Sequence, residues 1–359
     1  MMNQNEKELF LQLCKFCNPN AKKIKKLLEK GCATPEVLGY LFENRMAGMA
    51  YGVLEKTELL DHVDREFRSS IRNAWSANKR FNDDYEGCLR FVSRELNEVG
   101  IPYALLKGAY LCGHYPKGYR TSNDIDVLIR PDDVSRVSSR LKLAGFRQGH
   151  LKNDQFVPAT REEIIASKMT RGETVPFIKA IALPYIKHLE VDLNFSLDYK
   201  NSDPSILTEM LDRAQDVTVG NVKIKTLEQD DFFLHLCAHL YKEATTMPWI
   251  RMKRDMTFYK FCDLYLLLDK TTKDDLHRIF SRATDLHLEH ELIYCLYCID
   301  LFFGSTKSEC LFDIDPQIFT FLDEVISPAD KKTYRYIESN PIKRFFCTDR
   351  LSLLNEVEL

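Results

Sequence analysis

The stretch "KGYRTSNDIDVLIRPDD", residues 117–133, decides the fold, because its centre combines a core strand with two charges. The segment "DIDVLI" is typical of a buried β-strand, yet Asp124 and Asp126 stand at the start of its apolar run. Side chains alternate along a strand, so both aspartates share one face while Ile125 and Val127 face the core. Two neighbouring carboxylates repel each other, and Mg²⁺, which prefers hard oxygen ligands, removes that penalty. We therefore expect a metal site here; the alternative is the solvated face of a half-exposed strand.

A second segment, "KHLEVDLNF" at residues 187–195, repeats this arrangement. Its alternation puts Glu190 and Asp192 on one face with His188 and Asn194, and apolar side chains on the other. If the two strands are neighbours, a third carboxylate joins the first two. Three acidic groups on adjacent strands suit phosphoryl or nucleotidyl transfer with two metal ions. A solvated polar face is again the alternative.

The segment "LLKGAYLCGHYPKGYRTSND", residues 105–124, places basic residues before the aspartates. A strand that ends at Lys107 and opens into a helix directs free backbone N–H groups and the positive end of the helix dipole at one point, which favours an anion. Gly108 permits close approach to the backbone, and the guanidinium of Arg120 suits phosphate oxygens. The alternative is a strand–turn–helix corner with basic residues on its surface.

The rest of the chain predicts an α+β protein, in which a small mixed sheet lies between two helical regions. Helical periodicity fills residues 1–98, the strands fall in 99–225, and helices return in 226–359. Helix start and stop signals predict helices over residues 20–31, 34–56, 67–100 and 131–146. Thr34 is the expected N-cap of the second helix, and Pro35 follows it at the first helical position. Two strands are predicted over 175–182 and 185–197, joined by a turn at Leu183 and Pro184.

Composition limits the class of protein. Hydrophobic residues make up 45% and charged residues 29% of the chain, and the formal net charge is -3. This balance disfavours a general binder of nucleic acid or anionic membranes. The start, "MMNQNEKELFLQLCKFC", lacks the pattern of a secretory signal, and no apolar run reaches the roughly 20 residues that cross a bilayer. With eleven cysteines as well, we expect a cytoplasmic protein.

Several other residues are weaker candidates for a site. Two Cys-x-x-Cys pairs have the spacing of zinc ligands, Cys14 with Cys17 and Cys295 with Cys298, and so do two histidines one helical turn apart, His235 and His239. The alternative is that these are small buried cysteines and histidines that fill helix faces. Asp263 lies in an apolar helix, so we expect it to be buried and paired, with Arg254 or a histidine as partner. The basic cluster "RMKRD", residues 251–255, is typical of a solvated helix face but also suits phosphates.

These residues together resemble the uncharacterised bacterial nucleotidyltransferases of the polymerase-β-like superfamily. The resemblance rests on "LLKGAYLCGHYPKGYRTSNDIDVLI" and on "VDLNF", "LHLCAHLYK" and "KFCDLYLLL", and it covers about residues 35–270. Two departures stand out. Ala109 replaces the serine of the wider superfamily, which removes a hydroxyl contact to the triphosphate, and Asn194 replaces a histidine.

The resemblance implies transfer of a nucleoside monophosphate from an NTP, with ATP expected, to an acceptor with release of pyrophosphate. It implies that Asp124 and Asp126 hold two Mg²⁺ ions, or Mn²⁺ in their place, and that Asp192 rather than Glu190 holds the catalytic ion. The implied nucleotide contacts are Lys107, Gly108, Arg120 and Ser122. We expect a small molecule or peptide as acceptor rather than nucleic acid. The alternatives are a catalytically silent binding or regulatory protein of this fold, and a metal-dependent phosphohydrolase or nuclease.

Overall fold

The computed structural model describes residues 2–170, 172–197, 204–308, 311 and 319–357. By its internal contacts the chain divides into two compact units. One unit consists of Asn73–Phe232, and the other combines Met1–Arg72 with Phe233–Leu359. The predicted three-region division, at residues 98 and 225, stays a prediction.

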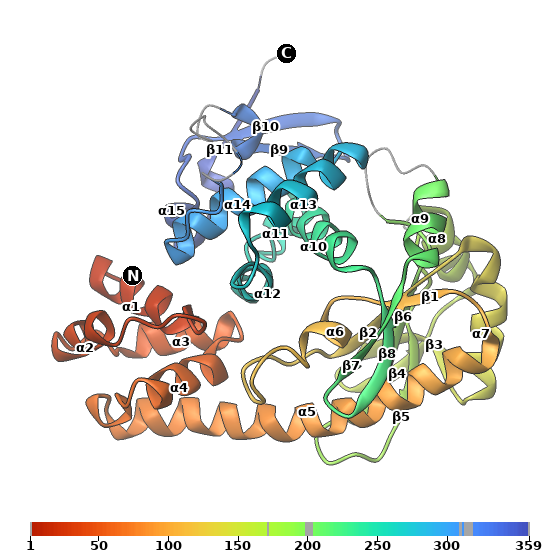
Figure 1. Cartoon of the computed structure of the whole chain (residues 1–359), viewed down its shortest axis with the longest axis horizontal. Helices are drawn as coiled ribbons and strands as arrows, with labels where there is room; N and C mark the ends of the chain where they lie inside the picture. The colour runs from red at the N-terminus through yellow and green to blue at the C-terminus, as the bar shows by residue number, and fades with distance from the viewer. Residues whose placement is uncertain (1, 171, 198–203, 309–310, 312–318, 358–359) are drawn as a thin grey trace. The chain divides into compact units, whose positions relative to one another are not determined.

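The unit Asn73–Phe232 is built on a mixed sheet (Figure 1). Among the described residues this sheet has six strands in the order β1-β2-β6-β5-β3-β4. The parallel pair is β2 with β6, and the other neighbours are antiparallel. The strands are β1 (Tyr103–Leu105), β2 (Asp124–Ile129), β3 (Arg147–Lys152), β4 (Gln155–Pro158), β5 (Phe177–Ala180) and β6 (His188–Asn194).

Helices and a hairpin complete this unit. The bounds are α5 (Arg65–Val99), which begins in the other unit, α6 (Gly108–Leu111), the 3₁₀ turn η2 (Pro131–Asp133), α7 (Val134–Leu143), α8 (Arg161–Thr170), α9 (Pro204–Asp212), β7 (Gln215–Val219), β8 (Val222–Thr226) and α10 (Gln229–Ala244), which continues into the other unit. Figure 1 shows α5 as the long orange helix. Gly100 follows it with a φ of 67°, a left-handed conformation that glycine adopts without strain.

One face of the sheet carries the hydrophobic core of this unit. Val127 of β2 and Val191 of β6 are fully buried, and they belong to one cluster with Leu89 of α5 and Val137 and Leu141 of α7. In β6 buried and half-buried positions alternate, as the sequence pattern predicted. Because successive side chains take opposite faces, the polar positions of β2 and β6 lie on the face away from this cluster.

The second unit is mainly helical. Its elements are α1 (Gln4–Cys14), α2 (Ala21–Glu29), α3 (Pro35–Glu43), α4 (Ala47–Lys56), η1 (Leu60–His62), α11 (Met247–Arg251), α12 (Phe258–Leu268), α13 (Lys273–Asp285), α14 (Glu289–Phe303), η5 (Thr320–Asp323), β9 (Glu324–Ser327), β10 (Lys332–Tyr336), α15 (Pro341–Phe345), η6 (Leu351–Leu353) and β11 (Leu354–Glu356). Aromatic rings join its two chain segments: Phe10 of α1 lies 5.1 Å from Phe258 of α12 and 5.6 Å from Phe345 of α15, between centroids.

The predicted helix over residues 34–56 is wrong as one element. Thr34 caps its start by accepting a hydrogen bond from the backbone N–H of Val37, as predicted. The helix then ends at Glu43, because Arg45 adopts a φ of 60° that interrupts the backbone hydrogen-bond series before α4 begins. The strands β3, β4, β7, β8 and β9–β11 were not predicted.

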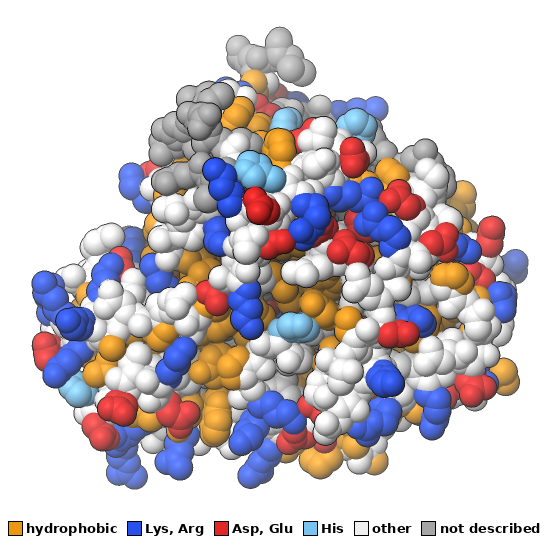
Figure 2. Space-filling model, viewed as in Figure 1, with side chains coloured by type: hydrophobic (Ala, Val, Ile, Leu, Met, Phe, Trp, Pro, Cys, Tyr) orange, Lys and Arg blue, Asp and Glu red, His pale blue; other side chains and the backbone are white. Residues whose placement is uncertain are grey.

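Two further observations bear on the class of protein. Within the part of the chain that the structure describes, every helix is too short or too polar to cross a membrane. On the face shown in Figure 2, Lys and Arg side chains are intermixed with Asp and Glu.

Candidate active site

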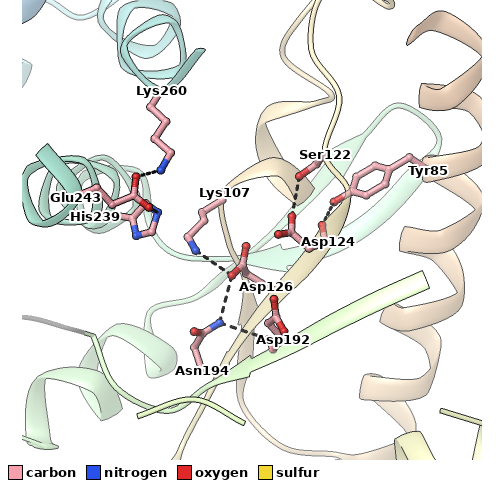
Figure 3. Close-up of polar contacts among 10 residues, drawn as sticks. All are labelled: Tyr85, Lys107, Ser122, Asp124, Asp126, Asp192, Asn194, His239, Glu243 and Lys260. Carbon is pink, nitrogen blue, oxygen red and sulfur yellow. Dashed lines mark hydrogen bonds and ion pairs between the residues drawn. The ribbon is translucent and has the colours of Figure 1, made fainter. Parts of the chain in front are cut away.

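The parallel pairing of β2 with β6 brings the predicted carboxylates together. Asp126 stands opposite Asp192 in the register, and Asp124 stands opposite Glu190 (Figure 3). Neighbouring strands lie about 5 Å apart, so four acidic side chains share one small area of the polar face. Asp126 is buried, with an exposure of 6%, and the other three are half-buried. The expectation that the third carboxylate joins the first two is met by this register.

Lys107 supplies the cation at this cluster. Its Nζ lies 2.9 Å from Oδ1 of Asp126 and forms an ion pair with it. The amide of Asn194 also donates to this oxygen, at 3.4 Å. Burial alone would lower the pKa of Lys107, but the charge of Asp126 and the hydrogen bond to it outweigh burial and raise that pKa. The ammonium of Lys107 therefore interacts with the carboxyl groups of Asp126, Asp124 and Asp192.

The remaining carboxyl groups are costly to ionise. Burial, followed by the charges of Asp126, Glu190 and Asp124, raises the pKa of Asp192 well above its usual value. Burial and then the charge of Asp126 raise the pKa of Asp124, and burial with the charges of Asp124 and Asp126 raises that of Glu190. A surplus of negative charge is thus held on the polar face, which is the condition that a bound cation relieves.

The turn after β1 places Lys107 and Gly108 beside Ser122. Lys107 has a φ of 47°, in the left-handed region that non-glycine residues rarely adopt. Gly108 lies so close to Ser122 that a Cβ at position 108 would overlap the Oγ and Cβ of the serine. Only glycine therefore fits, and the hydroxyl of Ser122 stands at the turn while it donates to Oδ1 of Asp124 at 3.2 Å.

One part of the predicted anion site needs correction. The prediction relied on the dipole of a helix that follows Gly108, but α6 spans four residues, Gly108–Leu111. So few aligned peptide groups give only a small end charge. Any affinity of this turn for phosphate must therefore come from the ammonium of Lys107 and from individual donors.

Helix α5 fixes the loop between α6 and β2, which sequence reasoning missed. The amide of Asn82 donates to the backbone oxygen of Arg120 at 2.8 Å and accepts from the backbone N–H of Gly118 at 2.9 Å. The hydroxyl of Tyr85, which is also buried, donates to the backbone oxygen of Asp124 at 2.8 Å. These contacts join residues nearly 40 positions apart, so no local pattern announces them.

Arg120 is placed differently from the other predicted residues. Its side chain is buried, with an exposure of 7%, and its guanidinium donates to the backbone oxygen of Thr121. The structure therefore shows Arg120 as part of the loop, and its contact with phosphate stays a prediction.

The weaker candidates lie in the other unit. His239 directs Nε2 to Oε1 of Glu243 at 3.2 Å, and Lys260 forms an ion pair with the same buried glutamate (Figure 3). Asp263 is buried in α12, as predicted. The last residue of the 251–255 cluster, Asp255, is fully buried, and its carboxylate accepts hydrogen bonds from Nε and Nη2 of Arg350, both at 2.7 Å.

The carboxylates on β2 and β6 offer hard oxygen ligands for a metal ion. Within the described residues, no three His, Cys, Asp or Glu side chains converge as they stand on one ion-sized point. Neither the cysteine and histidine pairs nor the carboxylates on β2 and β6 form such a group, and among these carboxylates Asp126 is paired with Lys107. Mg²⁺, however, commonly takes one or two carboxylates and completes its shell with substrate phosphates and water. The hard oxygens and surplus negative charge here fit that requirement.

Fold and site together define a class: an α+β protein with a nucleotidyltransferase-type core, in which carboxylates of adjacent strands lie beside a lysine–glycine turn. The chain belongs to the family described as uncharacterised nucleotidyltransferase, whose model matches residues 33–304. The predicted family resemblance is thereby confirmed, and the matched range contains the predicted metal ligands and nucleotide contacts, residues 107–192.

Other comparisons add little. An antigenic nucleotidyltransferase-like protein from Paracoccidioides brasiliensis has a solved structure with a TM-score of 0.35 and 13% identity, over 57% of this chain and 91% of that chain. A likeness of this degree supports no argument about function. The search of curated proteins found no match to this chain.

Proposed function

We propose that this protein is a Mg²⁺-dependent nucleotidyltransferase that moves a nucleoside monophosphate from an NTP, with ATP expected, to an acceptor and releases pyrophosphate. The observation that carries the proposal is the register of Asp126 opposite Asp192 on parallel strands, beside the ammonium of Lys107. Membership of a nucleotidyltransferase family supports nucleotidyl transfer in general. Substrate, metal and mechanism are our inference.

We assign the metal-binding role to three carboxylates. Asp124 and Asp126 would hold two Mg²⁺ ions, and Asp192 would hold the one at the attacking hydroxyl; Mn²⁺ suits the same oxygens. Bound Mg²⁺ would neutralise phosphate charge and lower the pKa of the attacking hydroxyl. The raised pKa values of Asp124 and Asp192 support this assignment, because such groups gain from a nearby cation.

We assign the phosphates of the NTP to the turn after β1. Lys107 is the cation nearest to the carboxylates, and its ammonium would transfer from Asp126 to phosphate oxygens once metal neutralises the carboxylate. Gly108 remains a candidate for a backbone contact with phosphate, and Ser122, which fills the space beside it, offers a hydroxyl in place of the one that is lost at Ala109. Arg120 is a further candidate for a phosphate contact. Catalysis would then rest on positioning and charge neutralisation.

We propose a small molecule or a peptide as the acceptor. The intermixed charges on the face in Figure 2 support this choice over nucleic acid. The cysteines that the structure describes are all free thiols, which supports a reducing compartment, and we propose the cytoplasm.

A labelling experiment tests the proposal. The protein is incubated with Mg²⁺, cell extract and ATP that carries label in either the α or the γ phosphate. Transfer of the α label to an acceptor, with release of pyrophosphate, is expected, and Asp124→Asn and Asp126→Asn should abolish it. Glu162→Gln, an exposed substitution on α8 away from the carboxylates, is the matched control and should keep full activity.

Other outcomes would replace the proposal. Release of the γ label alone would indicate a phosphohydrolase. If no label moves but ATP raises the melting temperature equally in wild type and in Asp126→Asn, the protein binds nucleotide without using this site. Full α-label transfer by Asp126→Asn would remove the carboxylates from the mechanism.

A further inference from the structure

A cavity of about 430 Å³ lies within the mainly helical unit, and none of the residues to which a function has been assigned above lines it. Its walls come from the end of α1, the segment that leads into α2, the end of α12 and the segment after α14. This volume falls in the range of small-molecule sites, which is about 300–1,000 Å³. The cavity is therefore large enough for a metabolite.

The floor of the cavity is apolar and rigid. Tyr265 of α12 and Phe303 of α14 are buried and stack in parallel, with ring centroids 4.2 Å apart. Leu268 completes this floor and is also buried. Gln12 lines the wall with an exposure of 2%, and its Oε1 accepts no hydrogen bond from any described residue, while its Nε2 donates to Glu8.

Positive charge dominates the polar wall. Three lysines line the cavity, Lys15, Lys23 and Lys307, against the single carboxylate of Asp269. Lys23 is already paired with Glu8 at 2.5 Å, and the ammonium of Lys307 donates to the backbone oxygen of Thr271 at 2.6 Å. These two contacts hold both ammonium groups at the wall.

Lys15 is the lysine whose charge is not balanced. Among the described residues its ammonium makes no hydrogen bond and no ion pair. Its Nζ lies beside Gly304, the C-cap of α14. The negative end of the helix dipole attracts an ammonium there, but it is not a charged side chain that would pair with Lys15. Burial, opposed in part by Glu8 and assisted by the charge of Lys23, lowers the pKa of Lys15.

The segment after α14 is fixed in the shape that forms the cavity wall. The carboxylate of Asp300 accepts hydrogen bonds from the backbone N–H groups of Lys307 and Ser308, at 3.1 and 2.8 Å. It also accepts from the hydroxyls of Ser305 and Ser308. Lys307 is thus positioned before any ligand arrives, which lowers the entropic cost of binding.

We propose that this cavity binds a small organic phosphate. The phosphate would be held by Lys15, Lys23 and Lys307, and the organic part would lie on the Tyr265–Phe303 floor. Because Glu8 is paired with Lys23, the three ammonium groups face two carboxylates, those of Asp269 and Glu8, and a phosphate offsets the remaining positive charge. Lysine binds phosphate as a point charge. The polar side chains of Asn18 and Asn20 line the same wall and favour an organic part that carries hydroxyl groups, such as a sugar phosphate. This site is independent of the nucleotidyltransferase proposal.

Pyridoxal 5′-phosphate provides the test, because it is an organic phosphate whose aldehyde labels lysine. The amine of Lys15 attacks the aldehyde, an imine forms with loss of one water, and borohydride then reduces the imine to a stable secondary amine. Labelling is performed on the full chain in EDTA, and the modified peptides are identified by mass spectrometry. Lys107 near the carboxylates and exposed Lys26 on α2 lie in other peptides and are scored separately.

The expected result is preferential labelling of Lys15, at least about fivefold above Lys26, which ribose 5-phosphate suppresses in a saturable way. Labelling of Lys15 at the level of Lys26, or labelling that ribose 5-phosphate does not suppress, would overturn the proposal. As a second measurement, ribose 5-phosphate should raise the melting temperature, with affinity reduced about tenfold in Lys15→Gln and unchanged in Lys26→Gln. Equal affinity in both variants would also overturn it.

Discussion

Replacement of Asp192 by asparagine should stabilise the protein when no divalent metal is bound. Asp192 stands opposite Asp126 on a neighbouring parallel strand, at about 5 Å, where two like charges repel by about 1 kcal/mol in water and about 3 kcal/mol at an effective dielectric constant of 20. Attraction to Lys107 offsets part of this repulsion. We therefore expect a net gain of about 1 kcal/mol, which for a unit of this size raises the melting temperature by about 2–4 °C.

The assay is thermal unfolding of wild type and Asp192→Asn at about pH 7.5, where the carboxyl groups of the unfolded chain are ionised. The first series contains EDTA, and the second contains Mg²⁺ with a non-hydrolysable ATP analogue. In EDTA the variant should melt at the higher temperature. With Mg²⁺ and analogue the wild type should gain more stability than the variant, because the added cation relieves a repulsion that the variant lacks. Glu162→Gln should behave as wild type in both series.

Two results would refute this reasoning. If Asp192→Asn melts below the wild type in EDTA, the aspartate stabilises the fold and is not part of a repelling cluster. If the variant gains as much stability from Mg²⁺ and analogue as the wild type does, Asp192 is not a ligand of the metal.

Further predictions concern pH, the glycine turn and a buried ion pair. Because the pKa values of these carboxyl groups are raised in the folded state, their contribution to stability in EDTA should fall as pH rises above about 4, and the melting advantage of Asp192→Asn should grow over the same rise in pH; a constant advantage contradicts this. Gly108→Ala should cost about 2 kcal/mol or more of unfolding free energy through overlap with Ser122, and Ser122→Gly should restore part of it, as denaturant titration would show. Arg350→Ala should cost about 3–5 kcal/mol because it leaves the buried carboxylate of Asp255 unpaired, and Asp255→Asn should recover much of that loss; equal stability of both single variants and the double variant would contradict it.

The elements that sequence predicted well have strong local signals. The strand β2 ends in a continuous apolar run, residues 127–129, and β6 alternates polar and apolar residues, so both their existence and the face of Asp126 and Asp192 follow from side-chain periodicity. The long helix α5 has a sustained apolar stripe and ends next to Gly100. By contrast, no local pattern shows that these two strands are neighbours; we assumed it, and the parallel register of β2 with β6 supports the assumption.

The missed hairpin β7–β8 did carry a local signal, because two alternating strands flank Gly220-Asn221, whereas the missed hairpin β3–β4 lacks such a pattern. Strand β3, with the sequence "RQGHLK", is mostly polar and pairs with β4 through Asn153 and Asp154, which both adopt a positive φ. The pair Asn153-Asp154 was the one available signal for this hairpin, because both residue types tolerate that conformation. Contacts between distant residues, such as Asn82 with Arg120 or Ser122 against Gly108, depend on tertiary packing and cannot be found by local pattern.

Metal binding tests most directly whether the carboxylates on β2 and β6 form a metal–nucleotide site. Mn²⁺ replaces Mg²⁺ on such oxygens, and its electron paramagnetic resonance signal counts free and bound ions. With a non-hydrolysable ATP analogue present, we expect about two Mn²⁺ ions per chain, and at least about tenfold weaker binding in Asp126→Asn, with Glu162→Gln unchanged. If Asp126→Asn binds Mn²⁺ and the analogue as tightly as the wild type, the carboxylates do not form the site.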